Sequence, residues 1–312
     1  MSTTGSPHLE AVCSVFAKQV SQDSVVIGTP AKVNLFLEVL GKRDDGYHDI
    51  NSLFQAVSLF DRITFTRVKD GSGISIDLTN DAHVPIDESN LIARAFRLMR
   101  DRFGLTDGLQ VQLEKNIPIA AGLAGGSADA AATILAVCGL WDLGLDFGQM
   151  AELGLEIGSD LPFFFTRGQA MVGGRGEKIT ETDFPTDYWI ILATPDLHIS
   201  TAESYAALRI DLTKTKIPFS FQRCKSLRRF IDALEPIGND FEKVHLRSYP
   251  VLERIKDGLL GIGAQLTRMS GSGPTVFGLF DSVPETKSKR LFGKETGRVI
   301  VVRPVALPVR LP

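Results

Sequence analysis

Alternating apolar and polar residues near the start of the chain predict a β-strand. The apolar positions recur at every second residue, at Val33, Leu35, Leu37 and Val39. Because successive side chains of a strand point to opposite faces, one face is expected to be buried and the other exposed. Lys32 and Asn34 then lie side by side on the exposed face. Such a lysine is most often a solvated charge, and the alternative is that the pair lines a pocket.

Similar patterns predict the other elements. A hairpin turn at 41–46 precedes strands at 47–57, 63–68, 74–78, 109–113, 170–172, 189–193 and 299–302, and two strands around a turn at 265–280. Helical spacing predicts helices at 90–103, 127–144, 146–157 and within 239–260. Asp87 and Ser89 are expected to cap the first of these, and Thr201 is expected to cap a further helix. A short amphipathic helix is predicted from Leu9 to Val20. This mixture of helices and strands predicts an α+β fold.

A glycine- and alanine-rich stretch, IPIAAGLAGGSADAAATIL, runs from Ile117 to Leu135 between a predicted strand and a predicted helix. Gly122, Gly125 and Gly126 allow positive φ and close approach of the backbone to a ligand. Ser127 and Asp129 suit the helix cap or its first turn. Because the start of a helix exposes unpaired N–H groups, this stretch predicts a phosphate-binding loop. The alternative is an ordinary strand-to-helix turn with small residues for packing.

Three shorter stretches carry candidate chemistry. Asp160, in GSDLPFFF, suits either a helix N-cap or a catalytic base among apolar neighbours. Tyr47 and His48 open a strand, where they either pack or hold a flat heterocycle. A second glycine- and serine-rich loop lies at Ser270 to Gly273.

Composition excludes several classes of protein. The chain has 312 residues, 44% hydrophobic, and a net charge of −3, which argues against a broad nucleic-acid surface. It has three cysteines and five histidines without HExxH or CxxC spacing, so we expect neither a dedicated zinc site nor a disulfide scaffold. Cys138 is expected to be a small buried thiol. No apolar run approaches the ~20 residues that span a bilayer, and no secretory signal is recognisable, so a cytoplasmic protein is expected.

Three segments together resemble the motifs of the GHMP small-molecule kinases. They are PAKVNLFLEVLGKRDDGYHDINSLFQAV, IPIAAGLAGGSADAA with GSDLPFFF, and LTRMSGSGPTVFGLF. The likeness runs from Thr29 to about Phe280. It is strongest to the members of the family that phosphorylate a cytidylylated methylerythritol in the non-mevalonate isoprenoid pathway.

The resemblance implies a two-lobed α+β GHMP-kinase fold, with a ribosomal-protein-like first lobe and an α/β-plait-like second lobe. The expected division is an N-terminal extension at 1–24, an ATP-binding lobe at 25–182 and a C-terminal lobe at 183–312. The implied reaction is phosphorylation of the 2-hydroxyl of 4-diphosphocytidyl-2-C-methyl-D-erythritol by ATP with Mg²⁺. Expected partners are this small-molecule cytidylyl substrate, no nucleic acid and no membrane, with a homodimer left open.

The resemblance also implies a role for single residues. Lys32 and Asp160 are the implied catalytic pair, with Asp160 as the base and Lys32 lowering its pKa. The implied ATP-binding residues are Pro118, Ile119, Ala120, Ala121, Gly122, Leu123, Ala124, Gly125, Gly126, Ser127 and Ala128. The implied substrate contacts are Asn34, and Tyr47, His48 and Tyr205 around the cytosine. Gly271, Ser272 and Gly273 support the nucleotide loop.

The chain departs from some members of the family by carrying alanine instead of glycine at 120, 121 and 124. Alanine predicts negative φ at these positions and a loop that flexes less. Backbone donors are retained.

Other families fit less well. A Walker-type NTPase lacks its GKS or GKT here, and a dinucleotide-binding domain lacks its GxGxxG and the later acidic residue. Mevalonate, homoserine and galactose kinases are the rivals within the superfamily, and they lack the tyrosine–histidine pair. A non-catalytic nucleotide-binding protein is the rival from another class.

Overall fold

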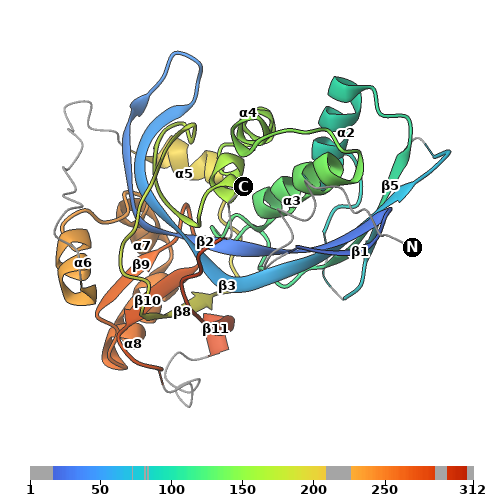
Figure 1. Ribbon diagram of the computed structural model, residues 1–312. Helices are drawn as coiled ribbons and strands as arrows, with labels where there is room; N and C mark the ends of the chain where they lie inside the picture. Colours follow the sequence, from blue (N-terminus) through green and yellow to red (C-terminus); the bar gives the residue numbers. More distant parts are fainter. Residues whose placement is uncertain are drawn as a thin grey trace.

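Two long antiparallel strands, β2 (Ser24–Lys42) and β3 (His48–Val68), run side by side through the molecule (Figure 1). The computed structural model describes residues 17–71, 73–80, 82, 84–208, 226–284 and 294–307. The turn between β2 and β3 confirms the predicted hairpin, with Gly46 at φ 85°. The ladder between the two strands is interrupted at three register shifts, so the strands bend as they pass from one half of the molecule to the other.

The first sheet is built around these two strands. Its main path is β1-β2-β3-β5-β4, and β6 joins β3 and carries β7. All pairs are antiparallel except β4 with β5. The remaining strands are β1 (Ala17–Ser21), β4 (Ile74–Leu78), β5 (Gly108–Glu114), β6 (Gln169–Gly174) and β7 (Lys178–Glu181).

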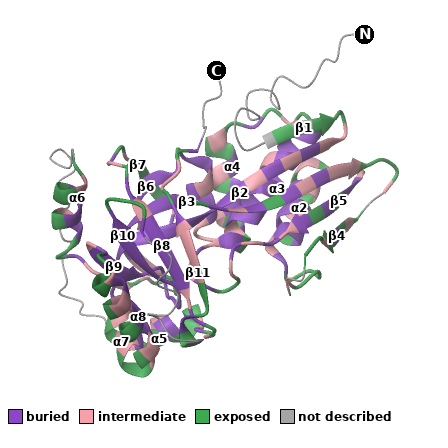
Figure 2. Ribbon diagram, turned by 90° about the horizontal axis from the view of Figure 1, so that it is seen from below, coloured by how far each residue is buried: buried purple, intermediate pink, exposed green. Residues whose placement is uncertain are grey.

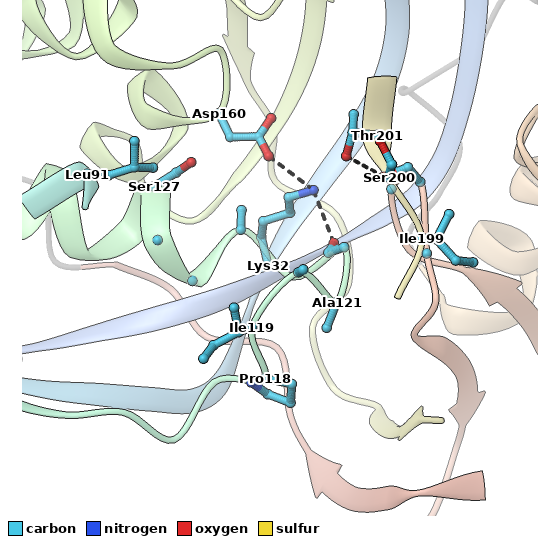
Figure 3. Close-up of a pocket in the computed structure, with 18 of the residues that line it drawn as sticks. Lys32, Leu91, Pro118, Ile119, Ala121, Ser127, Asp160, Ile199, Ser200 and Thr201 are labelled. Atoms are coloured by element: carbon cyan, nitrogen blue, oxygen red, sulfur yellow. Dashed lines mark hydrogen bonds and ion pairs between the residues drawn. The ribbon is translucent and has the colours of Figure 1, made fainter. Parts of the chain in front are cut away.

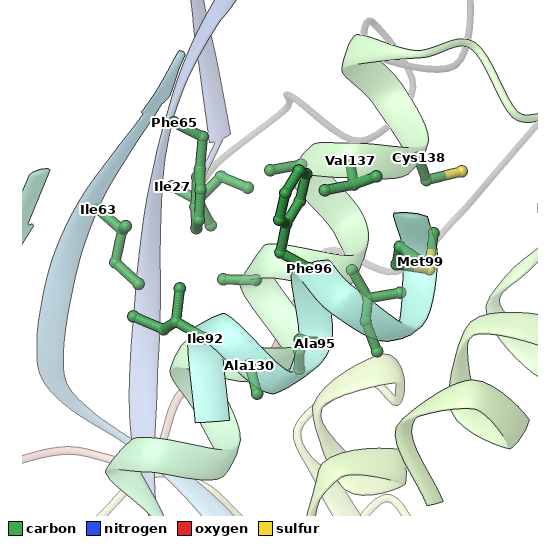
Figure 4. Close-up of a cluster of buried hydrophobic side chains, with 14 of the residues drawn as sticks. Ile27, Ile63, Phe65, Ile92, Ala95, Phe96, Met99, Ala130, Val137 and Cys138 are labelled. Atoms are coloured by element: carbon green, nitrogen blue, oxygen red, sulfur yellow. The ribbon is translucent and has the colours of Figure 1, made fainter. Parts of the chain in front are cut away.

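Four helices pack with this sheet, and α3 is the most buried of them. Their bounds are α2 (Leu91–Phe103), α3 (Gly125–Leu140), α4 (Phe147–Ile157) and the 3-10 helix η1 (Leu161–Phe165). Small residues such as Ala130 let α3 pack closely, and Phe96 of α2 fills the space beside Val137 (Figure 4). Cys138 is buried in the same cluster, as expected. This packing fixes the start of α3, to which the glycine-rich loop leads.

A second, fully antiparallel sheet has the order β11-β8-β10-β9. Its strands are β8 (Trp189–Thr194), β9 (Leu266–Met269), β10 (Val276–Phe280) and β11 (Arg298–Val302). The helices of this half are α5 (Thr201–Ala207), α6 (Leu227–Leu234), α7 (Glu242–Ser248), α8 (Pro250–Gly261) and the 3-10 helix η4 (Lys294–Thr296). The two sheets and their helices form a two-lobed α+β fold, which confirms the predicted fold class.

The expectation of one exposed face on the 32–39 strand is wrong. All residues from Pro30 to Val39 are buried, and Figure 2 shows the middle of β2 and β3 within the interior. The reason is that β2 contributes to the cores of both halves. Leu35 and Phe36 pack in one cluster with Phe277 of the second sheet, and Val25 belongs to the cluster under α2 and α3. The alternation of residues in one strand does not show that a distant part of the chain will cover its second face.

Several local predictions also need correction. Asn90, and neither Asp87 nor Ser89, caps α2, because its side chain accepts the N–H of Ile92. Ser200 caps α5, one residue before the predicted Thr201. Val20 lies in strand β1, which pairs with β2, so the predicted helix does not extend to it; its other residues, Leu9 to Phe16, lie outside the described part.

None of the helices in the described ranges has the length and apolar character needed to cross a membrane.

Candidate active site

The glycine-rich loop connects β5 to α3 and is pressed against the second lobe. Gly122 has φ 75°, and a Cβ at this position would lie 2.1 Å from the carbonyl oxygen of Ser270. The Ser270 hydroxyl donates to the Gly122 carbonyl at 2.8 Å, and the N–H of Thr275 donates to the Ala121 carbonyl at 3.3 Å. Only glycine satisfies both the positive φ and this close approach. The loop is therefore held by tertiary contacts.

The expectation of negative φ at the alanines of the loop is wrong at two of the three. Ala120 has φ 50° and Ala124 has φ 55°, whereas Gly125 and Gly126 lie inside α3. Left-handed backbone costs an alanine about 1–2 kcal/mol. Such a conformation persists only where the surroundings impose it, and here the contacts of Gly122 with the second lobe do so.

The start of α3 lacks the side-chain cap that neighbouring helices have. Asn90 caps α2 and Asp146 forms a capping box at α4, whereas Ala124 before α3 makes no side-chain bond. Ser127 lies in the first turn and lines the cleft beside the loop. The first N–H groups of α3 thus have no capping oxygen, which suits them to bind an anion.

Lys32 lies beneath this loop and connects it to the rest of the site. Its backbone N–H donates to the Leu123 carbonyl at 3.0 Å, and its ammonium donates to the Gly122 carbonyl at 3.4 Å. The ammonium also donates to Asn34 Oδ1 at 2.6 Å, and lies 3.4 Å from Asp160 Oδ2 (Figure 3). Lys32 is only 3% exposed. The prediction that Lys32 and Asn34 lie side by side is confirmed, and the pair is not a solvated surface charge.

Asp160 precedes η1 but does not cap it with its side chain. Its carboxylate is one-third exposed and faces the cleft, where its ion pair is with Lys32. The helix-cap interpretation of this aspartate is therefore wrong. The structure instead brings a carboxylate and a buried ammonium together beside the glycine-rich loop.

Asn34 lines the cleft and is held in place by contacts within the protein. Its amide nitrogen donates to the Ser52 hydroxyl at 3.0 Å, and its backbone N–H donates to Ser270 Oγ at 3.2 Å. With its Oδ1 on Lys32, this asparagine orients the ammonium. Ser270 was named as the start of the second loop and Ser52 lies within the first recognised segment, but the sequence assigned neither of them a contact with Asn34.

The second glycine loop, at 270–273, adopts positive φ at Gly271 and Gly273. Ser272 shares a 2.9 Å hydroxyl hydrogen bond with Thr201 at the start of α5. Asn239, which sequence reasoning missed, donates to the carbonyls of Met269 and Gly271 at 2.7 and 2.9 Å. These contacts anchor the second loop within its own lobe, and Ser270 and Thr275 join it to the first loop.

Of the three predicted aromatic residues, the structure brings two together. The His48 ring stacks on Tyr205 with centroids 4.5 Å apart and an interplanar angle of 15°. Tyr205 lines the cleft, whereas Tyr47 is 49% exposed and lies under the Arg175 guanidinium at 4.8 Å. Desolvation, with Lys42, lowers the pKa of His48, and desolvation, with Asp160, raises the pKa of Tyr205 to about 12. Both rings are therefore uncharged at neutral pH.

These residues surround a cleft of about 680 Å³. The first lobe contributes Lys32, Asp160 and the loop, and the second contributes Tyr205 and the 271–273 loop. The described residues include no group of histidines, cysteines and carboxylates arranged to hold a metal. The cleft thus combines an uncapped helix start with the buried Lys32 ammonium and the accessible Asp160 carboxylate.

Known proteins share this architecture. Residues 90–168 match the model of the GHMP kinases N terminal domain, and residues 221–290 match that of the GHMP kinases C terminal. A protein of Exiguobacterium sibiricum, named 4-diphosphocytidyl-2-C-methyl-D-erythritol kinase, is 40% identical over 90% of this chain and 98% of its own length. The chain belongs to the GHMP kinase family. A Geobacillus protein of the same name is 42% identical over 82% of this chain and 88% of its own length.

Solved structures place the chain in the same family fold. A crystal structure of 4-(cytidine 5'-diphospho)-2C-methyl-D-erythritol kinase is 30% identical, covers 90% of this chain and 99% of its own, and has a TM-score of 0.71. Homoserine kinase from Cytophaga hutchinsonii covers 94% of this chain and 98% of its own with a TM-score of 0.67 at 17% identity. The second likeness shows the fold alone.

The close contact at Gly122 predicts that one added methyl group lowers the stability of the fold strongly. Gly122→Ala is expected to lower the free energy of unfolding by about 2 kcal/mol or more, because it combines positive φ with a clash against backbone. Gly126→Ala is the matched control, since its Cβ would meet only Leu91 Cδ1 at 3.4 Å and it lies within a helix. Denaturant unfolding of both variants measures the difference; equal stabilities would contradict the contact.

Proposed function

We propose that this chain is an ATP-dependent kinase that phosphorylates the 2-hydroxyl of 4-diphosphocytidyl-2-C-methyl-D-erythritol. The observation that carries the proposal is the Lys32–Asp160 pair, 3.4 Å apart, beside an uncapped helix start in one cleft. The names of the relatives that are about 40% identical support the choice of substrate. The geometry supports phosphoryl transfer, which needs positioned donors, positive charge and an oriented nucleophile.

The nucleotide phosphates bind along residues 118–128 in this proposal. The backbone N–H groups at the start of α3 and the positive end of its dipole attract the polyphosphate. Lys32 supplies a fixed positive charge below Gly122, where the transferring group comes closest to the acceptor. The 271–273 loop supports this arrangement from the other lobe through Ser270.

Asp160 accepts the proton of the acceptor hydroxyl. Its carboxylate is one-third exposed to the cleft and lies 3.4 Å from the Lys32 ammonium. A tertiary alcohol is a poor nucleophile, so holding it in line with the γ-phosphate contributes as much as removing its proton. Asn34 orients the Lys32 ammonium through its Oδ1, and its remaining amide N–H contacts the substrate in this proposal.

Magnesium is part of the same proposal. Mg²⁺ prefers oxygen ligands and is usually held by one or two protein groups together with substrate phosphates. The Ser127 hydroxyl lines the cleft beside the loop and supplies an oxygen of this kind, so the site fits this ion. Bound there, the ion would neutralise charge on the phosphates.

The cytosine binds at the aromatic pair. The His48–Tyr205 stack shows that two flat rings fit face to face at the edge of the cleft, and Tyr205 is also held edge-on by Phe241 at 4.9 Å. A base stacks on Tyr205 once the histidine ring is displaced, and the uncharged imidazole can then hydrogen-bond the edge of the base. Tyr47, on the outer side under Arg175, is the proposed second wall.

The proposed lobe division remains 25–182 and 183–312 after the segment 1–24. A cytoplasmic location and a homodimer remain predictions.

A substrate comparison tests the proposed function. With ATP and Mg²⁺, the protein should convert the cytidylyl substrate with a kcat/KM far above that for mevalonate or homoserine, and CMP should inhibit competitively. Preference for mevalonate or homoserine would assign the site to another GHMP kinase. Nucleotide binding without turnover of any of the three would favour a non-catalytic protein.

Asp160→Asn tests the base. We expect kcat to fall roughly 10²- to 10⁴-fold, the range that general-base catalysis contributes. ADP affinity, measured by calorimetry, should stay close to that of the unchanged protein because the phosphates bind at the loop. Full activity in this variant would refute the assignment.

Tyr205→Ala tests the site for the base. Stacking on an aromatic side chain is worth about 1–3 kcal/mol, so the KM for the cytidylyl substrate should rise roughly tenfold or more. The KM for ATP in the same assays is the internal control and should not change. A substrate KM that stays constant would remove the stacking role of Tyr205.

A further inference from the structure

A buried cluster of three charged side chains lies beneath the nucleotide loop. Asp61 belongs to β3, Lys115 directly follows β5, and Asp129 lies in α3, and none of their side chains is more than 4% exposed. The Lys115 ammonium bonds to Asp129 Oδ2 at 2.6 Å and to Asp61 Oδ2. The sequence predicted Asp129 as a cap or first-turn residue of α3. The structure places it after the first turn, where it pairs with Lys115.

The cluster holds both ends of the loop. Asp61 Oδ1 accepts the backbone N–H groups of Asn116 and Ile117 at 2.5 and 2.8 Å, which are the residues that lead into the loop. Asp129 lies in α3, just after the loop ends. One ammonium thus joins the residues before and after 118–124.

Lys115 also packs tightly against the first residue of α3. A Cβ on Gly125 would lie 2.9 Å from the Lys115 ammonium and 2.8 Å from Ile117 Cγ2. Lys115 and Asp129 both line the cleft, and Asp129 Oδ1 is buried without a hydrogen-bond partner among the described residues. The cluster therefore reaches the surface on which the nucleotide is proposed to bind.

Stability alone does not account for this arrangement. Removing three charges from water is costly, and buried ion clusters often stabilise a fold no more than apolar residues of similar size. Burial raises the pKa of Asp129, and the attraction of the Lys115 ammonium opposes this rise. Desolvation lowers the pKa of Lys115, but the two carboxylates outweigh it and the net shift is upward, so the ammonium stays charged. The cluster instead fixes the positions of β3, the end of β5 and α3 relative to one another.

We propose that Lys115, with Asp61 and Asp129, is a positioning device that fixes the two ends of the nucleotide loop before the polyphosphate binds. The inference rests on the proposed function, since it assigns the loop to a nucleotide. Binding to a loop that is already ordered avoids the entropy cost of ordering it, so nucleotide affinity depends on the cluster. Lys115 acts through the backbone of the loop.

Calorimetric titration with ADP tests the proposal without the cytidylyl substrate. Lys115→Met keeps an unbranched side chain, one atom shorter, but removes its charge, and Asp129→Asn keeps the shape of the aspartate. We expect the Kd of ADP and the KM of ATP to rise roughly tenfold or more in each, equivalent to 1.4 kcal/mol. The KM of the cytidylyl substrate should not change, because its contacts are made on β2, β3 and α5.

Asp107→Asn is the matched control. It breaks the ion pair of Asp107 with Arg67, 2.7 Å long and partly buried, just before the opposite end of β5. It should lower thermal stability without altering ADP affinity. If Lys115→Met does not fold, Asp129→Asn decides the question.

The outcomes separate the two proposals. ADP affinity equal to that of the unchanged protein in a folded Lys115→Met or Asp129→Asn variant would overturn the positioning role. A comparable loss of affinity in Asp107→Asn would also overturn it, because general destabilisation would then be the cause. Failure of the unchanged protein to bind ADP would instead refute the proposed function.

Discussion

The ammonium of Lys32 is the group on which the arrangement of the cleft depends. It contacts the Asn34 amide, the carbonyl of Gly122 in the loop and the carboxylate of Asp160. A cation buried to this extent must be compensated, and here each of its partners comes from a part of the proposed site. The position of the lysine is set by β2, which is covered on both faces and packs in the cores of both lobes. The packing of β2 in both lobes therefore determines the position of the Lys32 ammonium.

The nucleotide loop owes its conformation to its surroundings. Two of its alanines adopt left-handed backbone, which their own preferences disfavour. The loop is held by Ser270 and Thr275 from the second lobe, by the backbone of Lys32 from below, and by the Lys115 cluster at its ends. A loop held in this way presents ordered N–H groups to a polyphosphate, and we regard this as the physical basis of the proposed site.

Local patterns in the sequence predicted what depends on local structure. The side-by-side placement of Lys32 and Asn34 followed from the two-residue period of a strand, and the hairpin and the strand–turn–strand unit at 265–280 followed from glycine turns. What failed depends on distant contacts. Burial of both faces of β2 requires the second lobe, and positive φ at Ala120 and Ala124 requires the loop contacts. Lys32 and Asp160 lie in motifs that are far apart in the chain, so local patterns could not predict their contact. The resemblance to GHMP kinases did predict that they share a site. Asn239, Asp61 and Lys115 lie outside the recognised motifs, and the motifs did not show that Ser52 bonds to Asn34 or that Asp129 pairs with Lys115.

A crystal structure with an unreactive ATP analogue and the cytidylyl substrate tests the central claim most directly. The account predicts that the polyphosphate follows residues 118–128 and that the acceptor hydroxyl lies within about 2.6–3.2 Å of the Asp160 carboxylate, with the Lys32 ammonium beside the transferring phosphate. A polyphosphate bound away from this loop, or an acceptor hydroxyl turned away from Asp160, would contradict it.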